Sequence, residues 1–220
     1  MIHDSAIIRG NVELGERVTI EPYAVVTGPC TIEDDAWIGS HAIIGGSPQV
    51  RGLYPQPSSA PYTNGGVWVG AGATIREHSI IHHGVVSETR IGAGALIMLA
   101  THIGHDCSVG DHSTIGSLSA LGGFVQIGVD STFGQGVIVH PWIIIGGGSM
   151  IGMNAAVTQD VLPYQKVAGV PARLLGANYH KAPTMRTEWN GADVDLTTAT
   201  HHAVMLKRRE ELRSEWASRA

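Results

Sequence analysis

Apolar residues recur at every sixth position along most of the chain. The longest series runs from Val85 to Val157, and shorter series run from Ile2 to Ile44 and from Val69 to Ile81. A glycine often follows the apolar residue, and a small residue often stands four positions after it. Such a short, fixed period is typical of stacked units that cannot bury an apolar face alone. Because a six-residue unit is too short for a helix and a turn, each unit is expected to be a short strand and a bend.

This unit resembles that of the hexapeptide-repeat proteins, which are left-handed parallel β-helices with three units in each triangular coil. The resemblance implies the left hand, since the general rule for parallel crossovers favours the right. Residues three hexads apart, such as Val85 and Ile103, would then stack on neighbouring coils, ~4.8 Å apart. The expected fold is all-β, a left-handed parallel β-helix of about eight coils with a short C-terminal helical segment.

Composition agrees with this fold and excludes several functions. The chain of 220 residues has 29 Gly and only 2 Phe, which suits a narrow core of Ile and Val. A net charge of −5 and the absence of a basic patch in the repeats argue against a nucleic-acid binder. The start lacks a signal-peptide pattern, and no segment reaches the ~18 apolar residues of a membrane span. Cys30 and Cys107 occupy small positions several coils apart, so both are expected to be reduced and the protein cytoplasmic.

Two interruptions of the register are candidate sites for function. The segment 46–66 contains four prolines and leaves the coil as a loop insertion, carrying Gln49 and Arg51. We expect this loop to cover an acceptor substrate. Between Ile81 and Val85 the register slips by four residues, and this break carries His82 and His83. His83 is expected to be solvated.

The pattern divides the chain near residue 165. Residues 1–165 form the predicted β-helix domain, and residues 166–220 contain a coil cap, a polar segment and a helix. The helix is expected from about Thr200 to Arg219, because Met205, Leu212 and Trp216 fall at helical spacing.

The densest cluster of functional groups is the segment 101–107. His105 lies near a bend and can reach the surface, and Gly123 occupies the equivalent position one coil later. A base beside an accessible backbone N–H is suited to acyl transfer, because the base deprotonates the nucleophile and the N–H stabilises the oxyanion. Asp106 can orient the imidazole only if the two residues sit at a corner, since adjacent strand residues point apart.

The stretch His102-Ile103-Gly104-His105-Asp106-Cys107-Ser108-Val109-Gly110 resembles the catalytic segment of the UDP-N-acetylglucosamine O-acyltransferases of lipid A biosynthesis. The similarity continues through Ala120–Gly123, His140 and Gln159–Tyr164, and upstream through Ile75–His82. The resemblance covers most of residues 1–165. It implies a homotrimer that moves an acyl chain from acyl carrier protein to a sugar 3-hydroxyl.

The same resemblance assigns roles residue by residue. His105 matches the general base, Asp106 its neighbouring acid and Gly123 the backbone oxyanion donor. The residues that match the acceptor-binding positions of the family, some in the cleft between subunits, are His82, His102, His140 and, less closely, Arg51.

The sequence departs from the family in two places, and the second puts the donor in question. Phe124 stands where the family has a further cleft histidine, and the C-terminal portion is shorter than the helical domain of the family. The stretch 169–173 resembles instead the closing motif of coenzyme-A-dependent hexapeptide acetyltransferases, which makes Arg173 a candidate donor-binding residue near coenzyme phosphates. A coenzyme-A-dependent sugar O- or N-acetyltransferase is therefore the alternative to a carrier-protein-dependent enzyme.

Other functions fit the residues less well. A zinc site of His82, His102 and His105, as in carbonic anhydrases of this fold, lacks the ligand spacing of those enzymes. A scaffold without catalysis leaves the His-Asp-Gly set unexplained. The favoured function is an acyltransferase acting on a nucleotide-linked amino sugar, with no bound cofactor or metal and with a carrier-protein or coenzyme A thioester as substrate.

Overall fold

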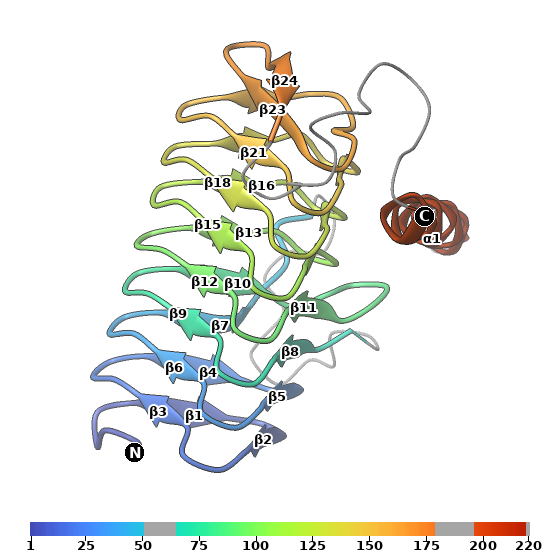
Figure 1. The fold of residues 1–220 in the computed structure, drawn as a ribbon. Coiled ribbons are helices and arrows are strands. Elements are labelled where there is room, and N and C mark those ends of the chain that lie inside the picture. Colours follow the sequence, from blue (N-terminus) through green and yellow to red (C-terminus); the bar gives the residue numbers. More distant parts are fainter. Residues whose placement is uncertain (51–64, 179–195, 219–220) are drawn as a thin grey trace.

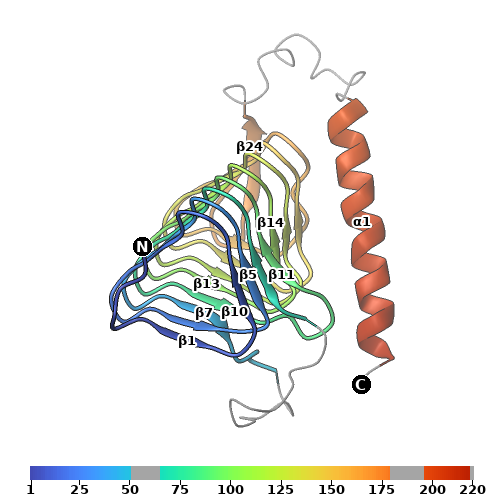
Figure 2. The same ribbon diagram turned by 90° about the horizontal axis from the view of Figure 1, so that it is seen from below.

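A computed structural model of the chain describes residues 1–50, 65–178 and 196–218. The strands build the three walls of a triangular prism, with the N-terminus at one end and β24 at the other (Figure 1). Seen from the N-terminal end, successive strands follow one another counterclockwise as the chain recedes, so the β-helix is left-handed (Figure 2). The predicted fold class is confirmed.

Each wall is one sheet whose neighbouring strands come from successive coils. The first sheet consists of β1 (Ile7–Arg9), β4 (Val25–Thr27), β7 (Ile43–Gly46), β10 (Ile80–His82), β13 (His102–Ile103), β16 (Ala120–Leu121), β19 (Ile138–Val139) and β22 (Ala156–Val157). The second consists of β2 (Val12–Leu14), β5 (Cys30–Ile32), β8 (Val67–Val69), β11 (Thr89–Ile91), β14 (Ser108–Val109), β17 (Gln126–Ile127) and β20 (Ile144–Ile145). The third consists of β3 (Thr19–Ile20), β6 (Trp37–Ile38), β9 (Thr74–Ile75), β12 (Leu96–Ile97), β15 (Thr114–Ile115), β18 (Thr132–Phe133), β21 (Met150–Ile151), β23 (Gln165–Ala168) and β24 (Arg173–Ala177).

The apolar residue of each hexad fills the interior of the prism. Ile103 pairs with Leu121 of the next coil in the parallel ladder, and both side chains are almost fully buried. The small position is crowded because the chain turns there. Buried Ser113 and Ser131 use the space to donate Oγ–H bonds to the Gly128 carbonyl at 3.0 and 2.9 Å. These bonds satisfy a corner carbonyl that would otherwise lie unpaired inside the wall.

The corners require a left-handed backbone. Asp106, Phe124 and Trp142 occupy the same corner on three successive coils and have φ values of 59°, 63° and 69°. Bulky side chains rarely adopt this conformation. A continuous stack of coils imposes it here, because the same bend recurs at each level of the prism.

The two breaks in register lie where the sequence pattern places them. The first insertion leaves after β7 and returns before β8, and its interior, with Arg51, lies outside the described residues. The predicted role of this loop over the acceptor therefore stays a prediction. At the second break Ile80 pairs with His102, so this coil accommodates four extra residues before β11. Beyond residue 165, β23 continues the parallel ladder and β24 turns back against it, which ends the stack.

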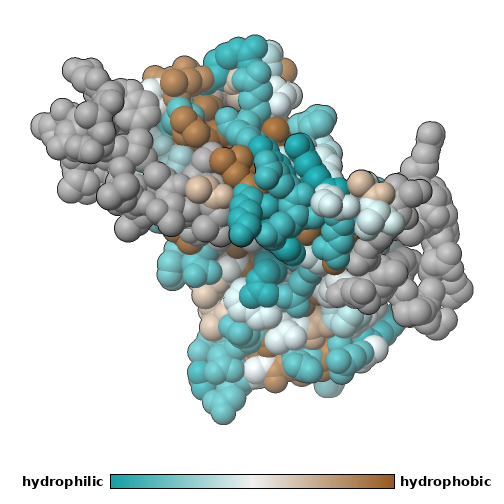
Figure 3. All heavy atoms as spheres, turned by 90° about the vertical axis from the view of Figure 1, so that its right-hand side faces the viewer, coloured by the Kyte–Doolittle hydropathy of each residue, from teal (hydrophilic) through white to brown (hydrophobic). Residues whose placement is uncertain are grey.

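The helix α1 (Leu196–Ala217) lies beside the prism and across its long axis (Figures 1 and 2). It begins four residues before the predicted start and buries Met205 and Leu212, as its spacing predicts. Hydrophilic residues dominate the middle of the molecular face on this side (Figure 3). In the part of the chain that the structure describes, no helix combines the length and the apolar character needed to cross a membrane.

Candidate active site

The imidazole of His105 is held by its neighbour at a corner of the prism. His105 Nδ1 lies 2.6 Å from Asp106 Oδ2, and the positive φ of Asp106 turns its side chain toward the ring. A carboxylate only accepts hydrogen bonds, so the ring proton lies on Nδ1 and Nε2 carries the lone pair. The side chain of His105 is 12% exposed, and Nε2 is therefore a base in a largely dehydrated setting.

The Asp106 carboxylate is fully buried and receives its donors from the second register break. Backbone N–H groups of Val85, Val86 and Ser87 donate to it at 3.0, 2.8 and 2.6 Å. The N–H of Asp106 itself donates to Thr89 Oγ1 at 2.9 Å. The four-residue insertion thus forms a nest of backbone dipoles that balances a charge removed from water. It also fixes the carboxylate that orients the base.

Gly123 lies directly beside the free nitrogen of His105. A Cβ atom built on Gly123 would stand only 2.5 Å from His105 Nε2, so no larger residue fits without moving the ring. The Gly123 N–H donates to no acceptor among the described residues, whereas the Gly123 carbonyl accepts from Trp142 N–H at 3.0 Å. A base and an unused backbone donor therefore belong to residues that lie side by side in one pocket, the pairing that acyl transfer requires.

One side of the surrounding pocket is polar and contains two further histidines. His82 and His102 lie with ring centroids 4.7 Å apart, and both line the pocket with His105 and Gln49. Burial, assisted by the neighbouring His102, lowers the pKa of His82 to about 4. Burial and the nearby His105 also lower the pKa of His102. Both rings are thus neutral at physiological pH.

The tautomer of His82 is fixed in the same way as that of the base. Its Nδ1 lies 2.6 Å from the Ser47 carbonyl, which can only accept, so Nδ1 carries the proton. Its Nε2 is buried and has no partner among the described residues. In this tautomer the nitrogen is an acceptor closed off from solvent.

The opposite side of the pocket is aromatic. Phe124 stacks on Trp142 with ring centroids 3.8 Å apart, and Trp216 of α1 meets Phe124 edge to face at 5.3 Å. Pro141 completes this side, and the pocket, which is open to solvent, has a volume of about 380 Å³. The cavity therefore has a polar half and an apolar half, with the base between them.

Other predicted site residues lie away from this cavity. His140 is exposed on the same wall, with Nδ1 3.0 Å from the Pro141 carbonyl, and does not line the pocket. Arg173 is exposed on β24 at the end of the prism and donates to the neighbouring Ala172 carbonyl. Arg51 is outside the described residues. The assigned roles of these three residues stay predictions.

The expectation that His83 is solvated is wrong. Its side chain is buried, with the residue 2% exposed, and Nε2 lies 2.9 Å from the Thr27 carbonyl. Burial lowers its pKa. The reason is the register break itself, because the extra residues fold His83 inward over Gly45, where a Cβ would meet its ring at 2.6 Å.

Two tryptophans of the pocket, Trp142 and Trp216, are not among the predicted site residues. Trp142 stands one coil after Phe124, so the same stacking rule that pairs His105 with Gly123 could have found it. Trp216 had no such signal beyond the apolar face of its helix. Its place beside His105 depends on how α1 docks on the prism.

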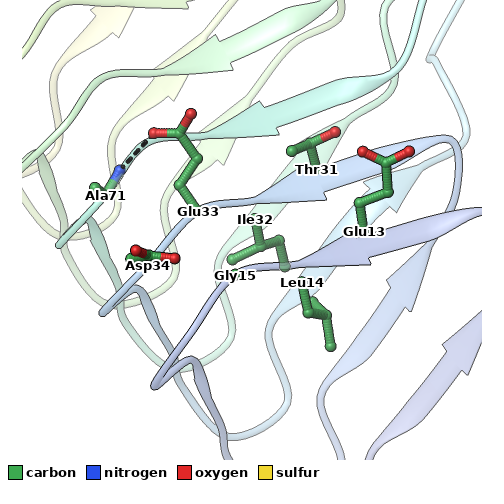
Figure 4. Close-up of a pocket in the computed structure, with 8 residues that line it drawn as sticks. All are labelled: Glu13, Leu14, Gly15, Thr31, Ile32, Glu33, Asp34 and Ala71. Atoms are coloured by element: carbon green, nitrogen blue, oxygen red, sulfur yellow. Dashed lines mark hydrogen bonds between the residues drawn. The ribbon is translucent and has the colours of Figure 1, made fainter.

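A larger hollow of about 500 Å³ lies among the N-terminal coils (Figure 4). Its carboxylates come from Glu13, Glu33 and Asp34, and two of them already serve the backbone. Glu33 accepts from Ala71 N–H at 3.2 Å, and Asp34 accepts from Glu16 N–H at 2.7 Å. Its lining adds the Thr31 hydroxyl but has no histidine beside it to act as a base, so the smaller pocket beside His105 is the candidate active site.

Metal ligands and reactive thiols are not gathered in the described parts of the chain. Within residues 1–50, 65–178 and 196–218, no three His, Cys, Asp or Glu side chains are grouped so as to hold a metal ion. Cys30 and Cys107 are buried free thiols, and burial raises the pKa of each to about 12.

Three relatives found by sequence comparison are all named for one acyltransferase activity. An acyl-[acyl-carrier-protein]–UDP-N-acetylglucosamine O-acyltransferase of Paraburkholderia phymatum is 35% identical over 198 residues, covering 80% of this chain and 73% of the relative. The Campylobacter concisus enzyme of that name is 32% identical over 176 residues, covering 79% of this chain and 65% of the relative. The chain thus spans slightly less than two thirds of the latter, and it spans 54% of a Burkholderia lata relative. No family model matches the sequence.

Solved structures agree with these relatives. A UDP-N-acetylglucosamine acyltransferase of Campylobacter jejuni superposes with a TM-score of 0.72 at 29% identity, over 90% of this chain and 82% of that one. The LpxA structure from Acinetobacter baumannii gives a TM-score of 0.70 at 29% identity, over 86% and 78%. The predicted resemblance is therefore confirmed, and the chain belongs to the acyl-[acyl-carrier-protein]–UDP-N-acetylglucosamine O-acyltransferase family.

Proposed function

We propose that this protein transfers an acyl group from acyl carrier protein to a hydroxyl of UDP-N-acetylglucosamine, the reaction that opens lipid A biosynthesis, with His105 as general base. The observation that carries the proposal is the position of Gly123, whose N–H is unused, directly beside His105 Nε2 and its lone pair. The names of the sequence relatives supply the donor and the acceptor.

The geometry supports a direct attack of the acceptor on the thioester, without an acyl-enzyme intermediate. The sugar hydroxyl gives its proton to His105 Nε2 while its oxygen attacks the thioester carbonyl carbon. The carbonyl oxygen becomes an oxyanion and accepts a hydrogen bond from Gly123 N–H. On collapse the carbon–sulfur bond breaks, and the leaving thiolate takes the proton back from the imidazolium. Asp106 keeps the imidazole in the required tautomer and stabilises its charged form during the step.

The polar half of the pocket suits the sugar. The neutral rings of His82 and His102 line this half and offer polar edges to sugar hydroxyls. Because burial keeps His82 and His102 neutral, they bind hydroxyl groups without competing with His105 for a proton. Gln49 enters the same half from the start of the loop insertion.

The test is a rate measurement with acyl-carrier-protein thioesters and UDP-N-acetylglucosamine, following the acylated sugar nucleotide by mass spectrometry. His105→Asn is expected to lower turnover by about 10²–10⁴-fold, the usual contribution of a positioned base. His112→Asn is the matched control, since His112 is an exposed corner histidine. Wild-type activity in His105→Asn, or equal losses in both variants, would refute the proposal.

The same assay with coenzyme A thioesters tests the alternative donor. Arg173 is exposed at the end of the prism and could meet coenzyme phosphates there. We expect poor turnover of coenzyme A thioesters and little effect of Arg173→Ala. Efficient turnover that depends on Arg173 would assign the enzyme to the coenzyme-A-dependent branch.

A homotrimer is part of the proposal. The pocket opens on an outer wall, and His140 is exposed beside it on the same sheet, as a residue of an intersubunit cleft would be. A closed ring of subunits would supply the missing wall. Multi-angle light scattering is expected to give a trimer, and a fully active monomer would contradict this. We also propose a cytoplasmic location, where the two buried thiols stay reduced, and cell fractionation tests it.

A further inference from the structure

The C-terminal helix is fastened to the prism at the active-site corner. Arg209 Nη1 lies 2.8 and 2.7 Å from the two Asp160 carboxylate oxygens and 3.3 Å from the Trp142 carbonyl. One turn on, Leu212 is buried at 3% exposure in a cluster with Val86 and Phe124. This ion pair and apolar contact hold the last turns of α1 against the corner that carries Phe124 and Trp142.

The docked helix places Trp216 beside the base. Its ring lies 5.9 Å from the His105 ring between centroids, with an interplanar angle of 24°, and it lines the same cavity. Together with the stacked pair of Phe124 and Trp142 it forms a continuous aromatic wall on one side of His105. The family histidine that the sequence lacks at Phe124 is thus replaced by apolar surface.

The reacting carbonyl divides the cavity between the two substrates. It must lie at His105 Nε2 and Gly123 N–H, so the acyl carbons start within one bond of that point. Histidine nitrogens and Gln49 line one direction from there, and rings line the other. A hydrocarbon chain gains free energy only on the aromatic side, and a sugar finds hydrogen-bond partners only on the polar side.

We propose that Phe124, Trp142 and Trp216 form the subsite for the acyl group, and that Trp216 limits the length of acyl chain that fits. The inference rests on the proposed acyl-transfer function. With about 380 Å³ shared by the reacting parts of both substrates, a tryptophan side chain supplied by α1 occupies space that a longer chain would need. Acyl-chain selection therefore depends on a residue outside the β-helix.

The experiment compares the wild-type protein with Trp216→Ala and Trp216→Phe over carrier-protein thioesters from acetyl to myristoyl. Trp216→Ala is expected to move the optimum of kcat/KM to longer chains, and Trp216→Phe to move it less. Each methylene newly admitted is worth about 10–200-fold in relative kcat/KM. The KM for UDP-N-acetylglucosamine should stay near its wild-type value. Trp37→Ala is the matched control, since Trp37 is half-buried on β6, far along the chain from the site, and bonds to Glu21.

A uniform fall in kcat/KM for every chain length in both Trp216 variants would show a packing role and overturn the inference. Dissociation constants for acyl-pantetheines of the same lengths give a readout that needs no turnover. A shift of the binding preference toward longer chains in Trp216→Ala supports the subsite even if no acceptor is acylated, and an unchanged preference refutes it. If the wild-type protein shows no activity with any carrier-protein donor, the proposed function is refuted, whatever the Trp216 variants show.

Discussion

Replacing Asp106 with asparagine is expected to inactivate His105 while leaving the β-helix folded. The two oxygens of the carboxylate accept hydrogen bonds from different donors. Oδ1 accepts the N–H groups of Val86 and Ser87 at 2.8 and 2.6 Å. Oδ2 accepts the N–H of Val85 at 3.0 Å and the Nδ1 proton of His105 at 2.6 Å.

Asparagine has only one oxygen for these donors. Kept at the Oδ1 position, it satisfies two backbone N–H groups and turns its amide N–H₂ toward Val85 and His105. The reverse orientation leaves Val86 and Ser87 unsatisfied, which is worse. The favoured orientation loses the hydrogen bond from the Val85 N–H, at a cost of about 1–3 kcal/mol in unfolding free energy. That is within the usual stability of a domain, about 5–15 kcal/mol.

The catalytic loss comes from the proton on the ring. An amide N–H₂ facing His105 Nδ1 forces that nitrogen to accept, so the proton moves to Nε2 and the base has no lone pair where the hydroxyl binds. Turnover should fall by about 10²–10⁴-fold, the contribution of general base catalysis. Asp106→Gly is expected to be less impaired than Asp106→Asn. Glycine tolerates the φ of 59° at this corner, and water can replace the carboxylate without dictating the tautomer.

The assay measures initial rates of acyl transfer from acyl carrier protein, together with denaturant unfolding of each variant. Asp111→Asn is the control, because Asp111 accepts a backbone N–H from Ala93 at 2.9 Å at another corner and, among the described residues, accepts no hydrogen bond from a histidine. Near wild-type turnover in Asp106→Asn would refute the assignment of Asp106 as the orienting residue. Equal turnover in Asp106→Asn and Asp106→Gly would refute the tautomer argument.

Three further outcomes follow from single contacts. Gly123→Ala should abolish most turnover with an intact fold, because its Cβ would lie 2.5 Å from His105 Nε2 and displace the ring; normal kinetics would contradict the packing. Since the folded-state pKa of His82 is about 4 against an ordinary 6.5, the unfolded chain binds more protons between these values. The unfolding free energy should therefore fall as pH drops from 6.5 toward 4, by up to about 3 kcal/mol from this residue. In denaturant unfolding of His82→Gln at several pH values, the unfolding free energy should depend less on pH. Arg209→Ala and Asp160→Asn should each increase proteolysis within α1, because both break the ion pair at 2.7 Å; unchanged protection would mean that apolar contacts alone hold the helix.

The repeat determines most of this protein without help from distant contacts. Because regular coils all have the same length, a spacing of three hexads places His105 beside Gly123 from the sequence alone. The same spacing stacks Asp106 on Phe124, but only the structure, with φ values of 59° and 63°, shows that both residues sit at a corner. The spacing of three hexads also places Phe124 next to Trp142 on successive coils, where the two rings stack. In a solenoid, residues one coil apart in the repeat lie side by side in space, so the repeat pattern is sufficient to predict which residues stack.

Only the tertiary structure decided what departs from that register. The four extra residues at the second break could have been a solvated bulge, yet they fold onto Asp106 and bury His83. The helix pattern predicts the buried face of α1, but not the surface on which that face packs. Arg209 and Leu212 select the corner beside His105 and so bring Trp216 into the active site. These contacts join residues that are far apart in sequence. Their pairing depends on the shapes and charges of the folded prism and of α1, and the repeat pattern does not encode that pairing.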